Sequence, residues 1–274
     1  MPEADGLLEM REHTKKVRAD ILDMIHLAGT GHPGGALSCV EILVALYFGV
    51  MRVRPDEPTW PERDRFVLSK GHAAPALYAV LMERGFFPRA ELATFRRFGS
   101  MLQGHPDRNR TPGVEVSTGS LGQGFAVAVG MALAGKVRGR RHRVFTLLGD
   151  GECDEGLVWE AALWAAHRGL DNLTAVIDRN HLQLDGWTQD ILNLNPLPEK
   201  WQAFGWQVEE VDGHDLGCLF EALDAPSAAG KPRMLIAETT KGKGVSYMEG
   251  KCEWHSGCPD DEQLSQALKE IKEA

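Results

Sequence analysis

One segment constrains the fold more than any other. The apolar run Val144–Leu148 ends in Gly149-Asp150-Gly151 and leads into a predicted helix. The run is apolar on both faces, as are the strands of a parallel sheet covered on both sides. A buried strand that ends in glycines and opens a helix is the place where open α/β sheets bind phosphates. The chain is therefore expected to form such a sheet, with a ligand site at its edge.

Further strands and helices are expected along the rest of the chain. Strands are expected at 66–69, 144–148, 173–178 and 234–238, with a fifth candidate at 206–212. Helical patterns cover 14–27, 39–49, 74–84, 125–137, 157–167 and 215–222, and an Asp-capped helix is expected at 260–274. This alternation predicts an α/β, doubly wound, mostly parallel sheet with helices on both faces.

The loop after Leu148 is acidic as well as glycine-rich. A phosphate-binding Walker loop is excluded because Leu157, not Lys, follows Gly156. In the dinucleotide fingerprint the third glycine comes earlier than Gly156 does here. The carboxylates of the loop, among them Asp150 and Glu155, would repel a bare pyrophosphate. A divalent cation held between carboxylate and phosphate, as Mg²⁺ is, would remove that repulsion.

Asn180 supplies a second oxygen ligand at the end of the next predicted strand. One strand–helix–strand unit separates Asp150 from Asn180, so both are expected at the same sheet edge. An ordinary acidic turn that caps a helix would explain either residue alone. The two residues at this spacing favour a metal–phosphate site.

Six segments resemble, in order, the motifs of transketolase-like enzymes that use thiamine diphosphate. They are Gly31-His32-Pro33-Gly34-Gly35, Ser69-Lys70-Gly71-His72, Gln103-Gly104-His105-Pro106, Ser117–Gly124, Gly149-Asp150-Gly151 with Asn180, and Lys241–Gly244 with Trp254-His255. The match runs from about Arg11 to Cys258. The resemblance implies the thiamine diphosphate-binding fold. Gly34-Gly35 and His181 depart from common family residues.

The resemblance also assigns roles to individual residues. The metal, Mg²⁺ with Ca²⁺ or Mn²⁺ as alternatives, would be bound by Asp150, the Asn180 side chain and the Leu182 carbonyl. The residues expected to contact the cofactor are His72, Gly119, Ser120, Leu121, Gly149, Asp150, Gly151, Glu155, Asn180, Leu182, Lys241 and His255. Glu155 and Glu160 also match family glutamates at the subunit boundary. A solvated role for Lys241 is the competing interpretation.

Four histidines are the expected catalytic residues by this resemblance: His32, His72, His105 and His255. A histidine titrates near neutral pH and can donate to or accept from sugar hydroxyls. The resemblance places three of them against the donor sugar, with His255 as a candidate for proton transfer. The remaining histidines are expected to have no such role: His13, His142 and His214 as solvated turn residues, and His26 and His167 within helices.

Family enzymes hold their cofactor between two domains, and this sequence shows the pattern of one of them. Residues 1–274 are read as a single diphosphate-binding domain without the pyrimidine-binding domain. The implied partner is the C-terminal transketolase subunit that carries that domain, in a heterotetramer acting on ketose and aldose phosphates. The alternatives are the matching half of a deoxyxylulose-phosphate synthase or a dehydrogenase E1 component, or a non-catalytic assembly subunit. The segment 118–137, whose glycine loop is followed by the small-residue helix 126–135, is expected to pack on the sheet or on a second subunit.

Composition excludes several other classes of function. The net charge of −9, with basic residues scattered, gives no surface for nucleic acid or anionic membranes. No run reaches the length of a membrane helix and the start has no secretory pattern, so a cytoplasmic location is expected. The five cysteines are then reduced thiols, and Cys252-x2-His255-x2-Cys258 has too few ligands for structural zinc.

Overall fold

The computed structural model describes residues 4–274 and contains a five-stranded sheet in the order β1-β2-β3-β5-β4. The strands are β1 (Arg65–Leu68), β2 (Val144–Gly149), β3 (Leu173–Arg179), β4 (Gln207–Asp212) and β5 (Arg233–Glu238). All four pairings are parallel, and Gly149 at the end of β2 pairs with Asp178 of β3. The predicted strands, including the fifth candidate, are confirmed.

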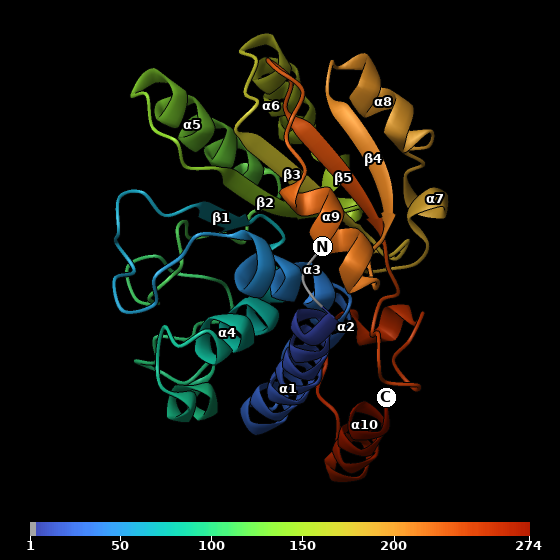
Figure 1. Cartoon of the computed structure of the whole chain (residues 1–274). Helices are drawn as coiled ribbons and strands as arrows, with labels where there is room; N and C mark the ends of the chain where they lie inside the picture. Colours follow the sequence, from blue (N-terminus) through green and yellow to red (C-terminus); the bar gives the residue numbers. More distant parts are fainter. Residues whose placement is uncertain (1–3) are drawn as a thin grey trace.

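Helices cover both faces of the sheet (Figure 1). On one side lie α1 (Ala4–Ala28), α2 (Pro33–Leu37), α3 (Val40–Val44), α4 (Ala74–Glu83) and α9 (Leu216–Asp224), and α10 (Asp261–Glu273) packs against α1. The opposite layer contains α5 (Gln123–Val137), α6 (Gly156–His167) and α8 (Leu197–Ala203). The doubly wound prediction is therefore confirmed.

Successive side chains along the strands face two separate hydrophobic cores, one on each side of the sheet. Phe145 and Leu147 of β2 face the core that contains α1, whereas Val144 and Leu148 face the core that contains α6. Because successive side chains of a strand point to opposite faces, an apolar run on both faces requires a cover on each side. β4 is an edge strand and is only partly buried, which explains its weaker signal in the sequence.

The helix boundaries follow local rules at several points. The Asp260 carboxylate accepts a bond from the Gln263 backbone N–H, and the Gln263 side chain accepts one from the Asp260 N–H, which completes a capping box at α10. Helix α5 packs on the sheet through Phe125, Ala128 and Ala132, so one of its two predicted roles is confirmed. Contact of α5 with a second subunit stays a prediction.

Other boundaries differ from the prediction. Helix α1 begins about ten residues earlier than expected, at Ala4. The expected helix 39–49 is α3 followed by a π-helical stretch, Ala45–Val50, most of which is buried. Two short helices, α7 (Thr188–Ile191) and α8, were not predicted because neither is long enough to show a periodic pattern.

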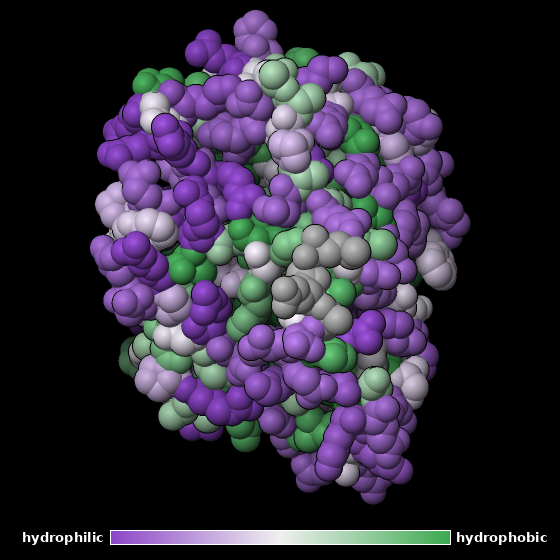
Figure 2. Space-filling model, viewed as in Figure 1, coloured by the Kyte–Doolittle hydropathy of each residue, from purple (hydrophilic) through white to green (hydrophobic). Residues whose placement is uncertain are grey.

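The surface and the cysteines are simple to describe. On the face drawn in Figure 2, hydrophobic residues are scattered among hydrophilic ones. Within residues 4–274, no helix combines the length and apolar character needed to cross a bilayer. All five cysteines are free thiols, as predicted, and Cys258 donates to the Pro259 carbonyl at 3.3 Å.

Candidate functional site

The carboxyl ends of the strands surround a cavity of about 250 Å³. Its lining comes from loops far apart in the sequence, because parallel strands deliver all their carboxyl ends to one edge. Most predicted cofactor contacts line it. The lining residues are Gly35, Lys70, His72, Leu121, Gly149, Asp150, Gly151, Glu152, Asn180, Leu182, Gln183, Leu184, Lys241 and His255.

Asp150 is a buried carboxylate at the edge of this cavity. Its Oδ1 accepts a bond from the Gly151 N–H at 2.8 Å, and its Oδ2 accepts one from the His181 N–H at 2.7 Å. Burial, helped by the negative charge of Asp178, raises the pKa of Asp150 to about 6. A cation beside this carboxylate would relieve the cost of its buried charge.

Asn180 and Leu182 lie next to Asp150, as predicted. Both are buried, and the Asn180 Oδ1 accepts a bond from the Leu182 N–H at 3.2 Å. Within residues 4–274, no three His, Cys, Asp or Glu side chains gather to hold a metal by themselves. A carboxylate, an amide oxygen and a carbonyl fit a hard cation such as Mg²⁺, which takes its other ligands from water and phosphate.

Lys241 is buried, so the competing interpretation of a solvated lysine is wrong. Its Nζ donates to the carbonyls of Leu182 at 3.2 Å and Gln183 at 3.1 Å, and lies 3.1 Å from Nδ1 of His255. Burial and the nearby positive charge of Lys70 lower the pKa of Lys241 to about 8. Lys241 therefore connects the predicted metal ligands to the predicted proton-transfer histidine.

The four predicted catalytic histidines lie together, although four separate loops carry them. The ring centroid of His32 lies 5.6 Å from that of His72, 6.3 Å from that of His105 and 5.6 Å from that of His255. The His72 and His255 rings are 5.3 Å apart. We call these four residues the histidine cluster.

The members of the cluster are held neutral. Burial lowers the pKa of His32 and of His255 to about 4 and lowers the pKa of His72 well below its ordinary value. Burial also lowers the pKa of His105. A neutral imidazole has one donor and one acceptor nitrogen. Because the Lys241 ammonium can only donate, Nδ1 of His255 is its acceptor and Nε2 of His255 carries the proton.

The segment Gly119–Leu121 lies beside the cluster, but its residues are placed differently. Leu121 lines the cavity, whereas Ser120 is exposed. A Cβ atom at Gly71 would come within 2.8 Å of the Gly119 nitrogen, so this close approach of two loops requires glycine. Gly119 has φ of 155° and packs against His105.

Glu155 does not line the cavity. It is the exposed N-cap residue of α6, and Glu160 on the same helix is also exposed. The glutamate of this loop that does line the cavity is Glu152, to which the sequence analysis assigned no role. The only available signal was its place directly after Gly149-Asp150-Gly151.

Glu152 connects three of the glycine loops. It is buried and accepts bonds from the Ser69 hydroxyl, from the Gly122 N–H at 2.8 Å and from the Gly149 N–H at 3.1 Å. Burial raises the pKa of Glu152, since desolvation penalises the charged form. Its carboxylate therefore holds three loops together at the wall of the cavity.

A buried ion pair between Lys70 and Asp178 was also missed. Lys70 donates to Asp178 and to the Gly35 carbonyl at 2.8 Å, and Asp178 also accepts from the Ser38 and Thr239 hydroxyls. The positive charge and the hydrogen bonds keep the pKa of Asp178 below its ordinary value. A charged residue at the end of an apolar strand was the signal that could have identified this pair.

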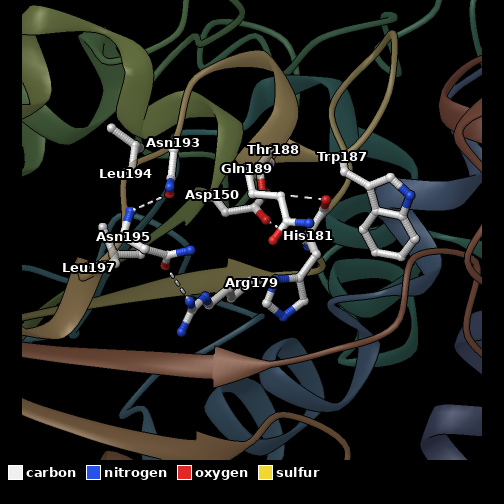
Figure 3. Close-up of a pocket in the computed structure, with 10 residues that line it drawn as sticks. All are labelled: Asp150, Arg179, His181, Trp187, Thr188, Gln189, Asn193, Leu194, Asn195 and Leu197. Carbon is white, nitrogen blue, oxygen red and sulfur yellow. Dashed lines mark hydrogen bonds between the residues drawn. The ribbon is translucent and has the colours of Figure 1, made fainter.

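A smaller cavity of about 140 Å³ lies on another side of Asp150 (Figure 3). His181 enters it with a left-handed backbone, φ of 63°, and its Nε2 lies 2.7 Å from Glu238. Arg179 pairs with Glu238 at 2.9 Å and donates to Asn195 at 2.7 Å. The role of His181 is therefore to orient Asp150 through its backbone N–H while its ring pairs with Glu238.

The three histidines expected to be solvated turn residues are not, so that prediction is wrong. His13 lies in α1, stacks on Phe48 at 3.9 Å and pairs with Glu83 at 3.0 Å. His142 is buried. His214 is the most constrained of the three: its Nδ1 lies 3.1 Å from a Glu41 oxygen, and its Nε2 accepts from the Thr240 N–H at 2.9 Å.

Comparisons with known proteins agree with this geometry. Residues 10–272 match the family model described as "Transketolase, thiamine diphosphate binding domain". A 6-deoxy-6-sulfo-D-fructose transketolase subunit of Clostridium sp. (strain MSTE9) is 47% identical over 266 residues, covering 97% of each chain. An apulose-4-phosphate transketolase subunit of Phocaeicola vulgatus is 46% identical, covering 95% of this chain and 92% of the relative.

Solved structures agree with the sequence relatives. The transketolase of Campylobacter jejuni superposes with a TM-score of 0.90 at 33% identity, over 96% of this chain and 42% of that one. This chain thus spans about two fifths of that transketolase, while it matches the named subunits over nearly their whole length. The chain belongs to the transketolase family and carries its thiamine diphosphate-binding domain.

Proposed function

We propose that this chain is the diphosphate-binding subunit of a transketolase. The reaction transfers a two-carbon ketol unit from a ketose phosphate to an aldose phosphate. The observation that carries the proposal is the histidine cluster, whose members His72 and His255 line the cavity that holds Asp150 and Asn180. Four neutral imidazoles beside a phosphate-type site suit a substrate rich in hydroxyl groups.

The proposed metal site uses the Asp150 carboxylate, the Asn180 side chain and the Leu182 carbonyl. These oxygen donors fit Mg²⁺, with Ca²⁺ or Mn²⁺ as substitutes, and the diphosphate would complete the coordination. The bound thiamine diphosphate supplies the electron sink for cleavage of the carbon–carbon bond. His72, Gly151 and the Gly119–Leu121 segment would orient it, and Lys241 would offset negative charge. Glu155, exposed on α6, would act at a subunit boundary.

The histidine cluster would handle the sugar. His32 and His105 can each accept from one hydroxyl and donate to another. His255, with its proton on Nε2, would move a proton to or from a substrate oxygen. Lys241 lies between His255 and the proposed metal ligand Leu182. Proton transfer and metal binding would therefore be carried out by different residues.

We further propose that residues 1–274 form one diphosphate-binding domain that works with a C-terminal transketolase subunit carrying the pyrimidine domain. The relatives of similar length are named as subunits, which supports this division. Two copies of each would make a heterotetramer. We propose the cytoplasm as its location, since free thiols suit a reducing compartment. The net charge of −9 gives no reason to expect nucleic acid or membrane partners.

The test is a ketol-transfer assay with thiamine diphosphate, Mg²⁺, a ketose phosphate donor and an aldose phosphate acceptor. This chain alone is expected to be inactive, and addition of the partner subunit is expected to restore transfer. Because one relative is named for a sulfonated ketose, a 6-sulfonated ketose is the second donor. Substantial activity of this chain alone would refute the need for a partner.

His255→Ala tests the role of the cluster in the same assay. A 10²–10⁴-fold loss is typical when a positioned acid–base group is removed. His167→Ala is the matched control, because His167 ends α6 and lies outside the cavity. If His255→Ala retained full activity, the proton-transfer role of His255 would be wrong. If the complex bound cofactor without turnover of either donor, the chain would be an assembly subunit.

A further inference from the structure

Arg96 has an unusual backbone for its residue type. It follows the 3₁₀ helix Arg89–Thr94 and has φ of 60°, in the left-handed region. Residues with a side chain seldom adopt this conformation, and such positions cluster at functional sites. The Arg96 N–H donates to the Leu102 carbonyl at 2.8 Å, which holds the turn in place.

The guanidinium of Arg96 bridges two loops of the histidine cluster. Its Nη1 donates to the Thr30 hydroxyl at 3.2 Å, and Thr30 lies two residues before His32. It also packs on Gly104, where a Cβ atom would lie 3.0 Å from Nε and 3.1 Å from Nη2 of Arg96. Gly104 directly precedes His105, so one side chain contacts the loops of both histidines.

The charge of Arg96 is not neutralised locally. Arg18 pairs with Glu41 and Arg63 pairs with Glu115, whereas Arg96 has no carboxylate partner among residues 4–274. Its Nε is buried without a hydrogen-bond partner. An unpaired cation acts on whatever titratable groups lie near it. Here burial lowers the pKa of His32 and that of His105, and the charge of Arg96 lowers both further.

Other groups also face His32 and His105. Arg96 differs from them because it contacts both the loop that carries His32 and the loop that carries His105. His105 is flanked by Arg96, the His32 ring and the Gly119 backbone. The charged and titratable groups that face His32 are Arg96, Lys241, His72, His105 and His255. Within residues 4–274, removal of Arg96 therefore leaves Lys241 as the cation near His32 but no cation near His105.

We propose that Arg96 is a positioning residue for ketol transfer, which clamps the loops of His32 and His105 together. Its unpaired charge adds to burial in disfavouring the protonated form of both imidazoles. Neutral imidazoles can accept as well as donate hydrogen bonds, whereas an imidazolium can only donate. The clamp also sets the distance between two groups that must contact one sugar. The catalytic part of this inference rests on the proposed function. Its electrostatic part concerns the free chain and does not depend on that function.

The first experiment titrates the histidines of the free chain by NMR, with His32→Asn and His105→Asn used for assignment. Arg96→Gln removes the charge and should raise the pKa of His105 by about one unit, and that of His32 by less. Arg96→Lys keeps the charge and should leave both titrations near those of the wild type. Arg97→Gln is the control, because Arg97 is the adjacent, exposed arginine.

The second experiment measures kcat and KM against pH with the partner subunit. Arg96→Gln should lower kcat/KM by about tenfold, less than the loss of an acid–base group itself, and move the acidic limb to higher pH. Arg96→Lys should restore the acidic limb but not the full kcat, since a lysine lacks the planar fork. Unchanged histidine titrations in a folded Arg96→Gln chain would overturn the proposal. If Arg96→Gln does not fold, a shifted His105 titration in Arg96→Lys would overturn the proposal instead.

Failure of the proposed function would look different. A complex without ketol transfer would leave the NMR titrations fully readable, because they need neither cofactor nor partner. An Arg96→Gln chain with shifted titrations but wild-type kinetics would show that Arg96 does not position the histidines for transfer.

Discussion

Nζ of Lys241 lies 3.1 Å from Nδ1 of His255 and donates to the Leu182 carbonyl at 3.2 Å. One buried cation thus contacts both a predicted metal ligand and the predicted proton-transfer residue. Its contacts fix the tautomer of His255 and connect the predicted metal-binding residues to the histidine cluster.

Lys241→Met should lower kcat of the assembled enzyme by about 10²-fold, since His255 would lose the donor that sets its tautomer. The fold should persist, because an apolar side chain of similar length replaces a buried charge. Lys243→Met is the control, as Lys243 is partly exposed and pairs with Glu249. Wild-type turnover with Lys241→Met would contradict the assigned contact.

Asp150→Asn should remove the Mg²⁺ dependence of cofactor binding. The amide preserves the shape of the side chain but supplies no negative charge to a cation. We expect thiamine diphosphate affinity to fall by about 100-fold or more, measured by calorimetry with Mg²⁺ and again with a chelator. Asp185→Asn, an exposed position in the following loop, should behave as wild type. Equal cofactor affinity of Asp150→Asn and wild type would exclude Asp150 as a metal ligand.

Glu152→Ala should destabilise the fold by about 3 kcal/mol, because it leaves the Ser69 hydroxyl and two backbone N–H groups without their acceptor. Glu155→Ala provides the comparison, since Glu155 is exposed on the same loop. Urea unfolding of both variants measures the difference. Equal stability of the two would mean that Glu152 does not hold the glycine loops together.

The stability of the chain should fall in acid through His255. Its pKa is about 4 in the folded chain against an ordinary 6.5. The unfolded chain therefore binds more protons between these values, and stability is lost as pH falls from 6.5 toward 4. His255→Asn should gain on the order of 1–2 kcal/mol relative to wild type at pH 5 compared with pH 8, after allowance for partial exposure.

Urea unfolding at the two pH values checks this expectation, with His167→Asn as the control at the end of α6. A pH-independent difference between His255→Asn and wild type would mean that His255 is not held neutral by its surroundings. Such a result would also weaken its assignment to proton transfer.

Much of the fold was predictable because its signals are local. Runs such as Val144–Leu148 are apolar on both faces only if both faces are covered, so they identify a buried parallel sheet. The glycines and histidines that follow the strands were predictable as a site, since parallel strands bring their carboxyl ends to one edge. That reasoning brought Asp150 and Asn180 together correctly.

Only the tertiary structure decided which charged residues are buried and what they contact. Lys241 and Glu155 were both expected to contact the cofactor, yet Lys241 is enclosed and Glu155 is exposed. Arg96 carried no signal that set it apart from solvated residues, and Glu152 carried only its place after Gly149-Asp150-Gly151. The physical reason is that the cost of burying a charge depends on partners supplied by distant loops, whereas strand and helix patterns depend on near neighbours in the chain.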